Sequence, residues 1–99
     1  MKQVVAIVKP FLAERVINAL ADQRIEELVV REVKGFGRQK NYLESYCSNE
    51  YVHVFVAKVE ISLWVEDENT EAVVERIKSV SRTGRLGDGK ILVLPICGI

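Results

Sequence analysis

The sequence has little of what most catalytic and metal sites are built from. Its 99 residues include one histidine, His53, and two cysteines, Cys47 and Cys97, which lie far apart. One imidazole without a neighbouring nucleophile and acid does not make a catalytic triad. Two isolated thiols are too few for a zinc site or a disulfide framework. We therefore expect a protein that is not an enzyme, with two idle thiols; a redox input from the thiols is the alternative.

The chain also lacks net charge and long apolar runs. Its 14 basic and 14 acidic side chains give a formal net charge of zero, so no overall positive field attracts nucleic acid or an anionic membrane. No apolar run reaches the roughly 18 to 20 residues that a bilayer span needs, and the N-terminal residues lack a signal-peptide layout. We expect one cytoplasmic domain, with a core small enough to favour oligomerisation.

The hydrophobic pattern predicts two helices and four strands. In order, these are a strand over 4–8, a helix over 12–20, a strand over 28–33 that ends at the glycines 35–37, a strand over 51–65, a helix from an N-cap at Asn69 or Thr70 to Arg82, and a strand over 91–94. The order β-α-β-β-α-β is typical of a ferredoxin-like α+β sandwich, in which a four-stranded antiparallel sheet has both helices on one face. The other face must be covered elsewhere, and Trp64 is a candidate for it.

Residues 38–50 show neither the helical nor the strand period, and a loop this long in a compact domain is usually functional. The strand that follows, over 51–65, is about three times the typical length. Its valines change from even to odd positions at Ala57 and Lys58. We interpret this change as a β-bulge. The first half of the strand then carries one arm of the loop into solvent, with Lys58 at the base of that arm.

Two glycine clusters lie next to cations, at 35–40 and at 84–90. The second fits the G-x-x-x-x-G-K spacing of a phosphate-binding P-loop, but Ile91 replaces the required Ser or Thr, and the segment follows a helix instead of a strand. Glycine backbone N–H groups beside cations nonetheless suit a small anion. The alternative for each cluster is a plain turn. Without catalytic groups, the two clusters together favour a small-anion or nucleotide sensor whose loop reports occupancy.

Three segments resemble the PII signal-transduction proteins: 6–11 (AIVKPF), 32–40 (EVKGFGRQK) and 83–91 (TGRLGDGKI). The likeness spans nearly the whole chain, up to about Pro95. It implies a single PII-like domain over 1–99 that forms a homotrimer with the sheets facing inward. It also implies adenine nucleotides in the clefts between subunits, and a T-loop at about 37–55 that contacts a regulated enzyme or membrane transporter.

The resemblance also implies the binding residues. Positions that match the family's nucleotide site are Ile7, Gly35, Phe36, Gly37, Arg38, Gln39, Leu63, Trp64, Gly87, Asp88, Gly89 and Lys90. Ile7, Leu63 and Trp64 among them match the positions around the base and ribose. Gln39 and Lys58 match the family's positions for magnesium, needed only with ATP, and for 2-oxoglutarate. Tyr51, preceded by Glu50, matches the position that many bacterial members uridylylate.

Some positions depart from the family. Val29 and Ser62 replace a threonine and a glutamate beside the nucleotide, and 47–49 replaces Arg-Gly-Ala at the loop tip. The given sequence ends at 96–99, before the Arg-x-Arg pair that holds the outer phosphates in the family. Because guanidinium groups make strong contacts with phosphate, we expect a preference for ADP or AMP over ATP.

These departures point to a divergent, carbon-side branch of PII-like proteins. In that interpretation Gln39, Lys40 and Lys58 hold bicarbonate beside ADP or AMP, since a small anion needs only two or three convergent donors. The alternative within the family is a nitrogen-regulatory sensor of ATP and 2-oxoglutarate. The alternative from another class is a structural or ion-responsive trimeric module.

Overall fold

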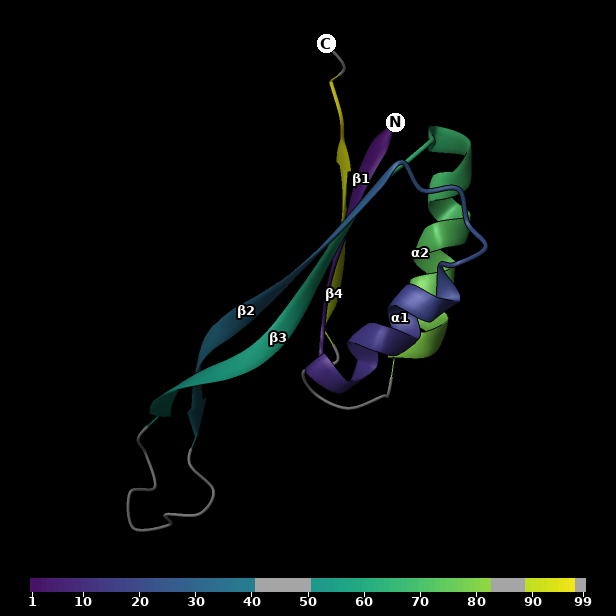
Figure 1. The fold of residues 1–99 in the computed structure, drawn as a ribbon. Helices are drawn as coiled ribbons and strands as arrows, with labels where there is room; N and C mark the ends of the chain where they lie inside the picture. The colour runs from purple at the N-terminus through teal and green to yellow at the C-terminus, as the bar shows by residue number, and fades with distance from the viewer. Residues whose placement is uncertain (41–50, 83–88, 98–99) are drawn as a thin grey trace.

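The computed structural model describes residues 1–40, 51–82 and 89–97, and the side chains of 36–40 and 51–54 lie outside that description. The elements are β1 (Lys2–Val8), the 3-10 helix η1 (Pro10–Leu12), α1 (Ala13–Ala19), β2 (Glu27–Lys40), β3 (Tyr51–Val65), α2 (Asp67–Ser81) and β4 (Lys90–Pro95). The predicted order is confirmed (Figure 1). In the described ranges, neither α1 nor α2 has the length and apolar character of a membrane-spanning helix.

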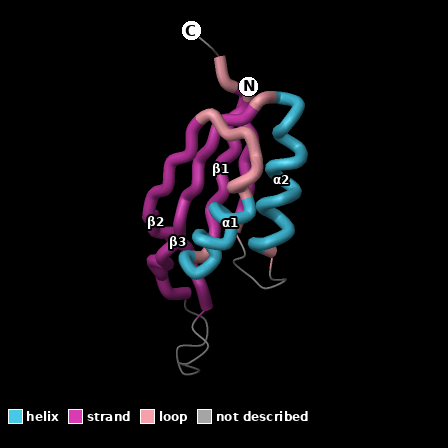
Figure 2. The backbone as a smooth tube through the Cα atoms, turned by 45° about the vertical axis from the view of Figure 1, so that its right-hand side comes forward, coloured by secondary structure: helices cyan, strands magenta, loops and turns pink. Residues whose placement is uncertain are grey.

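The sheet has the strand order β2-β3-β1-β4, and every neighbouring pair is antiparallel. Both helices lie on one face of it, as predicted (Figure 2). β1 and β3 are the two inner strands, so each has a partner on both sides. α2 packs against β1. Val8 at the end of β1 and Lys90 at the start of β4 lie at the same end of the sheet, where Val59 is the last residue of β3 that pairs with β1.

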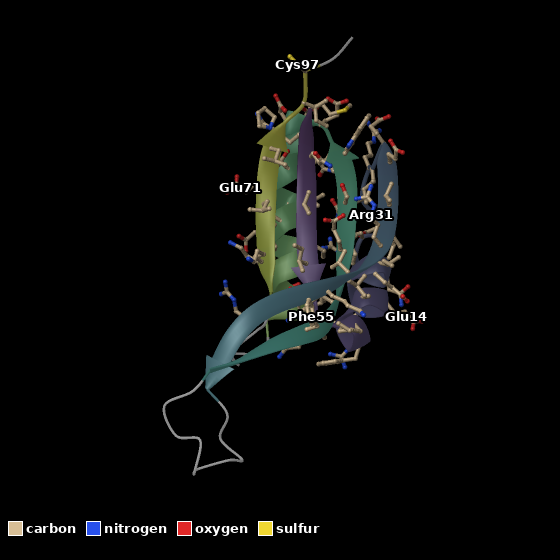
Figure 3. All side chains as sticks on the ribbon, turned by 90° about the vertical axis from the view of Figure 1, so that its left-hand side faces the viewer. Glu14, Arg31, Phe55, Glu71 and Cys97 are labelled. Atoms are coloured by element: carbon tan, nitrogen blue, oxygen red, sulfur yellow. The ribbon has the colours of Figure 1, made fainter. Side chains whose placement is uncertain are left out.

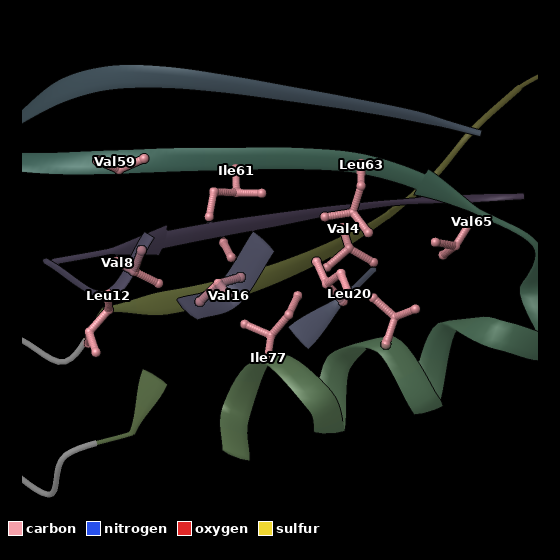
Figure 4. Packing of buried hydrophobic residues seen from close by; sticks show 12 residues of the cluster. Val4, Val8, Leu12, Val16, Leu20, Val59, Ile61, Leu63, Val65 and Ile77 are labelled. Carbon is pink, nitrogen blue, oxygen red and sulfur yellow. The ribbon is translucent and has the colours of Figure 1, made fainter. Parts of the chain in front are cut away.

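The core lies between the sheet and the helices (Figure 4). Alternate residues of β1 and β3 supply the sheet side: Val4, Ala6, Val8, Val59, Ile61, Leu63 and Val65, each at most 8% exposed. The helical layer supplies Leu12, Val16, Leu20, Val73 and Ile77. Each fully buried side chain of this size contributes about 1.5–3 kcal/mol relative to exposure. The helices are therefore held by this apolar layer more than by their end caps.

The start of α2 differs from the prediction. The helix begins at Asp67, with Glu66 as its N-cap, so the predicted cap at Asn69 or Thr70 is wrong. The Asn69 side chain instead donates to the Arg24 carbonyl (3.2 Å), and the Thr70 hydroxyl donates to the Glu66 carbonyl (3.0 Å). Acidic residues in the first turn, Asp67 and Glu68, complement the positive end of the helix dipole, and this allows the helix to begin earlier without a side-chain cap.

The strand prediction around the glycines is also wrong. β2 does not end at 35–37 but continues to Lys40, so 38–40 of the predicted loop are strand, while 41–50 lie outside the described residues. The pairing of β2 with β3 contains no bulge, because the register runs unbroken from Glu27↔Trp64 to Lys40↔Tyr51. On the Tyr51 side of Val59, β3 no longer pairs with β1. In this part of β3 the apolar residues change from odd to even positions because no helix packs there to bury one face. The pairing register of the backbone does not shift.

The β2–β3 hairpin projects beyond the rest of the sheet (Figure 1). This confirms the prediction that the first half of the strand over 51–65 leaves the core and that Lys58 lies at the base of the arm. Phe55 is 68% exposed and Val56 is 40% exposed, although they point to opposite faces. Backbone pairing, and not burial, therefore holds this part of the hairpin together.

Candidate functional site

The sheet face opposite the helices is open in this chain (Figure 3). The register places alternate residues of each strand on it: Ile7 lies between Glu60 of β3 and Lys90 of β4, and Arg31 of β2 lies across from Glu60. Trp64 belongs to this face and is 38% exposed, which confirms its predicted position on the second face. The open face therefore mixes charged, polar and apolar side chains.

One end of the open face holds a cavity of about 490 Å³ at the base of the hairpin. This volume lies within the range of small-molecule sites. We call it the hairpin-base cavity, and its lining residues are Ile7, Val33, Lys34, Gly35, Lys58, Glu60, Gly89 and Lys90. All four strands or their immediate flanks contribute, because β1 ends, β4 begins and the hairpin leaves the sheet at this place.

Positive charge dominates this cavity. Its lining includes three lysines, Lys34, Lys58 and Lys90, and one acid, Glu60. The Glu60 carboxylate accepts a hydrogen bond from the Arg31 guanidinium at 2.7 Å, so its charge is balanced by Arg31 outside the lining. Among the described lining residues, lysines outnumber carboxylates and the one carboxylate is already paired, a balance that favours an anionic ligand.

Gly89 is required by the backbone at this site. Its φ is +117°, and a Cβ there would lie 2.0 Å from the Ile7 carbonyl oxygen. Any other residue would force the start of β4 away from the end of β1. Gly35 differs, since a Cβ there would lie 3.6 Å from the Val56 carbonyl oxygen, an ordinary contact. Gly89 therefore positions the wall of the cavity, whereas Gly35 leaves space in it.

The other end of the open face holds a smaller cavity, of about 190 Å³. We call it the tryptophan cavity, and its lining residues are Gln3, Glu27, Val29, Arg31, Ser62 and Trp64. The Gln3 amide donates a hydrogen bond to the Ser62 hydroxyl at 2.8 Å. A partly exposed indole beside amide, hydroxyl and carboxylate groups suits a flat polar ring. Among the described residues, the two open-face cavities have separate linings.

The chain matches the family model described as "Nitrogen regulatory protein P-II" over residues 1–99. It belongs to the P-II family. The protein named nitrogen regulatory protein P-II of Rhizobium meliloti (strain 1021) is 47% identical over 93 residues, which cover 94% of this chain and 83% of the relative. The proteins of the same name from Azospirillum brasilense and Microchaete diplosiphon are 46% and 43% identical over 96 residues, covering 97% of this chain and 86% of each relative.

The structure brings together five of the residues that the likeness to the P-II family predicted. Ile7, Gly35, Lys58, Gly89 and Lys90 all line the hairpin-base cavity, although they come from four separate parts of the sequence. Their convergence is a property of the fold. What these residues bind stays a prediction.

Two predicted positions lie elsewhere. Trp64 lines the tryptophan cavity at the other end of the face. The Leu63 side chain is fully buried in the core under the helices. The prediction that Leu63 lies beside a base or ribose therefore cannot refer to its side chain, because neighbouring strand residues point to opposite faces. Only the backbone of Leu63 is left for such a contact.

The remaining predicted residues are described in part or not at all. Phe36, Gly37, Arg38, Gln39, Lys40 and Tyr51 have their backbones in the hairpin ladder, immediately beyond the cavity, and their side chains lie outside the description. Gly87 and Asp88 fall outside the described residues, as does Cys47, while Cys97 is exposed with a free thiol. In the described part of the chain, no cluster of His, Cys, Asp or Glu has the arrangement of a metal site.

Sequence reasoning missed several lining residues. Val33, Lys34 and Glu60 line the hairpin-base cavity, and Gln3 and Arg31 line the tryptophan cavity. The available signal was the strand period: Val33 lies two residues before Gly35, and Glu60 lies two residues after Lys58, so each pair shares a face. Using that signal requires the register between strands, which the sequence pattern alone did not supply.

Proposed function

We propose that this protein is a non-enzymatic signalling protein of the P-II type that binds an adenine nucleotide at the hairpin-base cavity and reports its presence through residues 37–55. The observation that carries the proposal is the convergence of Ile7, Gly35, Lys58, Gly89 and Lys90 around one basic cavity. Ammonium groups and glycine backbone N–H groups are the donors that phosphate oxygens require.

A homotrimer completes the proposed site. The open face exposes large apolar side chains, including Trp64, Leu92 and Leu94 at 38–47%, and a small subunit that exposes such a face is stabilised by covering it. In a closed ring of three copies, the tryptophan cavity of one subunit faces the hairpin-base cavity of the next. The first would then receive the base and the second the phosphates. P-II membership supports this arrangement.

The relatives favour nitrogen regulation as the physiological role. The curated relatives named above carry the name nitrogen regulatory protein P-II, which favours nitrogen regulation over the bicarbonate interpretation. We therefore propose ATP or ADP as the nucleotide and 2-oxoglutarate as the effector, with Lys58 holding a carboxylate. We propose magnesium only together with ATP, because Mg²⁺ is usually held by one or two protein oxygens and by substrate phosphates. The candidate protein ligand is the amide oxygen of Gln39.

The position of the cavity supports a route by which binding would reach a partner. Gly35 and Lys58 belong to the two strands of the hairpin at the point where it leaves the sheet. A ligand that contacts both strands there favours one setting of the hairpin over others by its differential affinity. A regulated enzyme or a membrane transporter that contacts residues 37–55 then meets a different surface with and without ligand.

Calorimetric titration tests this proposal. The purified protein is titrated with ADP, AMP and Mg-ATP, each alone, with 2-oxoglutarate and with bicarbonate. We expect Mg-ATP to bind more tightly when 2-oxoglutarate is present. Tightest binding of ADP or AMP, sharpened by bicarbonate alone, would instead assign the protein to carbon sensing, and no nucleotide binding would leave the structural or ion-responsive trimer.

A matched pair of variants locates the site. Lys90→Gln removes one charge-assisted contact and is expected to raise the nucleotide Kd by about tenfold. Lys2→Gln makes the same change on β1 at the far end of the sheet from this cavity, next to Asp67, and should leave the Kd unchanged. Equal affinity in wild type and Lys90→Gln would place the nucleotide outside the hairpin-base cavity.

A further inference from the structure

The tryptophan cavity is built on a row of three side chains that crosses the sheet. The register places Gln3 of β1 and Glu27 of β2 directly opposite Trp64 of β3, so all three lie on the open face. An amide therefore flanks the indole on one side, and a carboxylate flanks it on the other. Because neighbouring strands lie about 4.8 Å apart, the two flanking backbones are about 10 Å apart. This width suits one flat ring that lies on the indole.

Ser62 holds the Gln3 side chain in place. The Gln3 Nε2 donates a hydrogen bond to the Ser62 hydroxyl at 2.8 Å, and Ser62 is only 8% exposed, so packing fixes the acceptor. An amide group has two N–H donors and one carbonyl oxygen. The bond to Ser62 uses one N–H, and in the described part of the chain no hydrogen bond uses the other N–H or the oxygen. One donor and one acceptor are left side by side for a ligand.

This donor and acceptor match one edge of adenine. A glutamine amide forms two hydrogen bonds with adenine, because it donates to N7 and accepts from the N6 amino group. Guanine carries a carbonyl oxygen, O6, in place of that amino group. The partly exposed indole of Trp64 supplies a stacking surface for the ring, and Val29 in the same lining has no polar side-chain atom. The amide of Gln3 is therefore suited to recognise the base, and the indole is suited to hold it.

The two charged side chains of the cavity are less suited to tell one purine from another. Arg31 donates to the Glu60 carboxylate at 2.7 Å, and Glu60 lines the hairpin-base cavity, so the guanidinium is oriented toward that cavity. Glu27 is exposed and offers acceptors only. It can accept from the amino group of adenine or from the N–H groups of guanine alike. Among the described lining residues, Gln3 therefore has the groups that distinguish the two bases.

We propose that Gln3 is the residue that selects adenine at the nucleotide site, and that Ser62 is the positioning residue that holds its amide. The inference rests on the proposed function, because it takes the tryptophan cavity of one subunit as the place of the base. The Gln3 N–H that is not bonded to Ser62 donates to N7, and the Gln3 oxygen accepts from the N6 amino group. Guanine places its O6 against that oxygen, so two acceptors meet with no hydrogen between them.

Calorimetric titration with base-modified nucleotides tests the assignment atom by atom. The purified protein is titrated with ADP, with 7-deaza-ADP, which lacks the N7 acceptor, and with IDP, which carries O6 in place of the amino group. We expect each modified nucleotide to bind about tenfold more weakly than ADP, since each loses a hydrogen bond to Gln3. In Gln3→Leu, ADP should bind about as weakly as the modified nucleotides do, and the three Kd values should agree within about twofold.

Three further variants serve as controls. Gln23→Leu makes the same change between α1 and β2, outside the tryptophan cavity, and should keep the wild-type preference for ADP over IDP. Ser62→Ala removes the hydroxyl that holds the amide and should lose much of that preference, whereas Ser62→Thr keeps a hydroxyl and should recover it. A serine with a merely structural role would change the affinity for all three nucleotides by the same factor.

The wild-type titration separates a failure of this inference from a failure of the proposed function. If the wild-type protein binds none of the nucleotides, the proposed nucleotide site is wrong and the inference falls with it. If the wild type binds ADP and Gln3→Leu keeps the preference for ADP over IDP, the nucleotide site stands and Gln3 does not read the base. Binding of GDP as tightly as ADP by the wild type would also overturn the inference and would point to Glu27 instead.

Discussion

The two faces of the sheet come from the same strands yet differ in almost every physical respect. On the helix side, Ile61 and Leu63 are fully buried in a continuous apolar layer. On the open side, their sequence neighbours Glu60 and Ser62 line two cavities. Because neighbouring strand residues point in opposite directions, stability and recognition alternate residue by residue. Changes on one face should therefore alter folding, and changes on the other should alter binding.

The largest effect expected is on the helix side. Leu63→Ala removes a fully buried side chain and should destabilise the fold by about 2–5 kcal/mol through lost burial and a cavity. Leu92→Ala is the matched variant on the open face, where the side chain is 47% exposed in the single chain, and its burial within that chain accounts for about 1 kcal/mol. Urea unfolding measures both. Equal costs would show that the assembly buries the open face as fully as the helices bury the other.

Gly89 tests the point where the two faces meet. Gly89→Ala places a Cβ against the Ile7 carbonyl at a strained φ, and we expect a loss of about 2 kcal/mol together with weakened anion binding in the hairpin-base cavity. Gly35→Ala meets only ordinary contacts and should change stability by less than about 0.5 kcal/mol. Thermal unfolding and calorimetry measure the two quantities. Equal stability in the two variants would contradict the steric argument.

A smaller effect is expected on the open face itself. Arg31→Gln breaks an exposed cross-strand ion pair with Glu60 and should cost about 0.5 kcal/mol, less at high salt. It also leaves the Glu60 carboxylate unbalanced in the hairpin-base cavity, so anion affinity should fall. Restoring neutrality with Glu60→Gln in the same chain should recover that affinity. If anion affinity is unchanged in Arg31→Gln, the charge of Glu60 does not reach the ligand.

The smallest effect lies at the start of α2. The Met1 ammonium, which bonds to the Asp67 carboxylate at 2.8 Å, holds the pKa of that carboxyl below its usual value of 3.8. A lowered pKa in the folded state adds stability that is present above about pH 4 and is lost as the pH falls through the folded-state value. Asp67→Asn should therefore be slightly less stable than wild type at pH 7, and the difference should disappear once the pH falls below the folded-state pKa of Asp67. If the stability difference between Asp67→Asn and wild type persists in acid, the ion pair with the Met1 ammonium is not its cause.

Much of the fold follows from local pattern, and the site does not. The period of the apolar residues predicts the order of the elements, because burial against one layer imposes it, and it places Trp64 on the open face. The same period does not predict that β2 continues from Gly35 to Lys40. There backbone pairing with β3 holds the strand, and no buried face constrains the side chains.

The cavities depend on long-range register. Ile7, Gly35 and Lys90 reach one place only because β1 pairs with β4 on one side and, through β3, with β2 on the other. Family resemblance predicted these residues without that register. It did not predict Lys34 or Glu60, and it could not exclude the side chain of Leu63, because the face of each residue is a property of the assembled sheet.

The unbroken ladder between β2 and β3 has a mechanical consequence. Residues 51–58 of β3 extend past the last pairing with β1, a reach of about 25 Å at about 3.3 Å per residue. A ribbon without an inserted residue keeps its cross-strand pairs in step from its base to its end. A rotation of about 10° at Lys58, carried along this ladder, would displace Tyr51 by about 4 Å, from the same rise per residue. A change at the cavity too small to disturb the core would then be magnified where the hairpin ends.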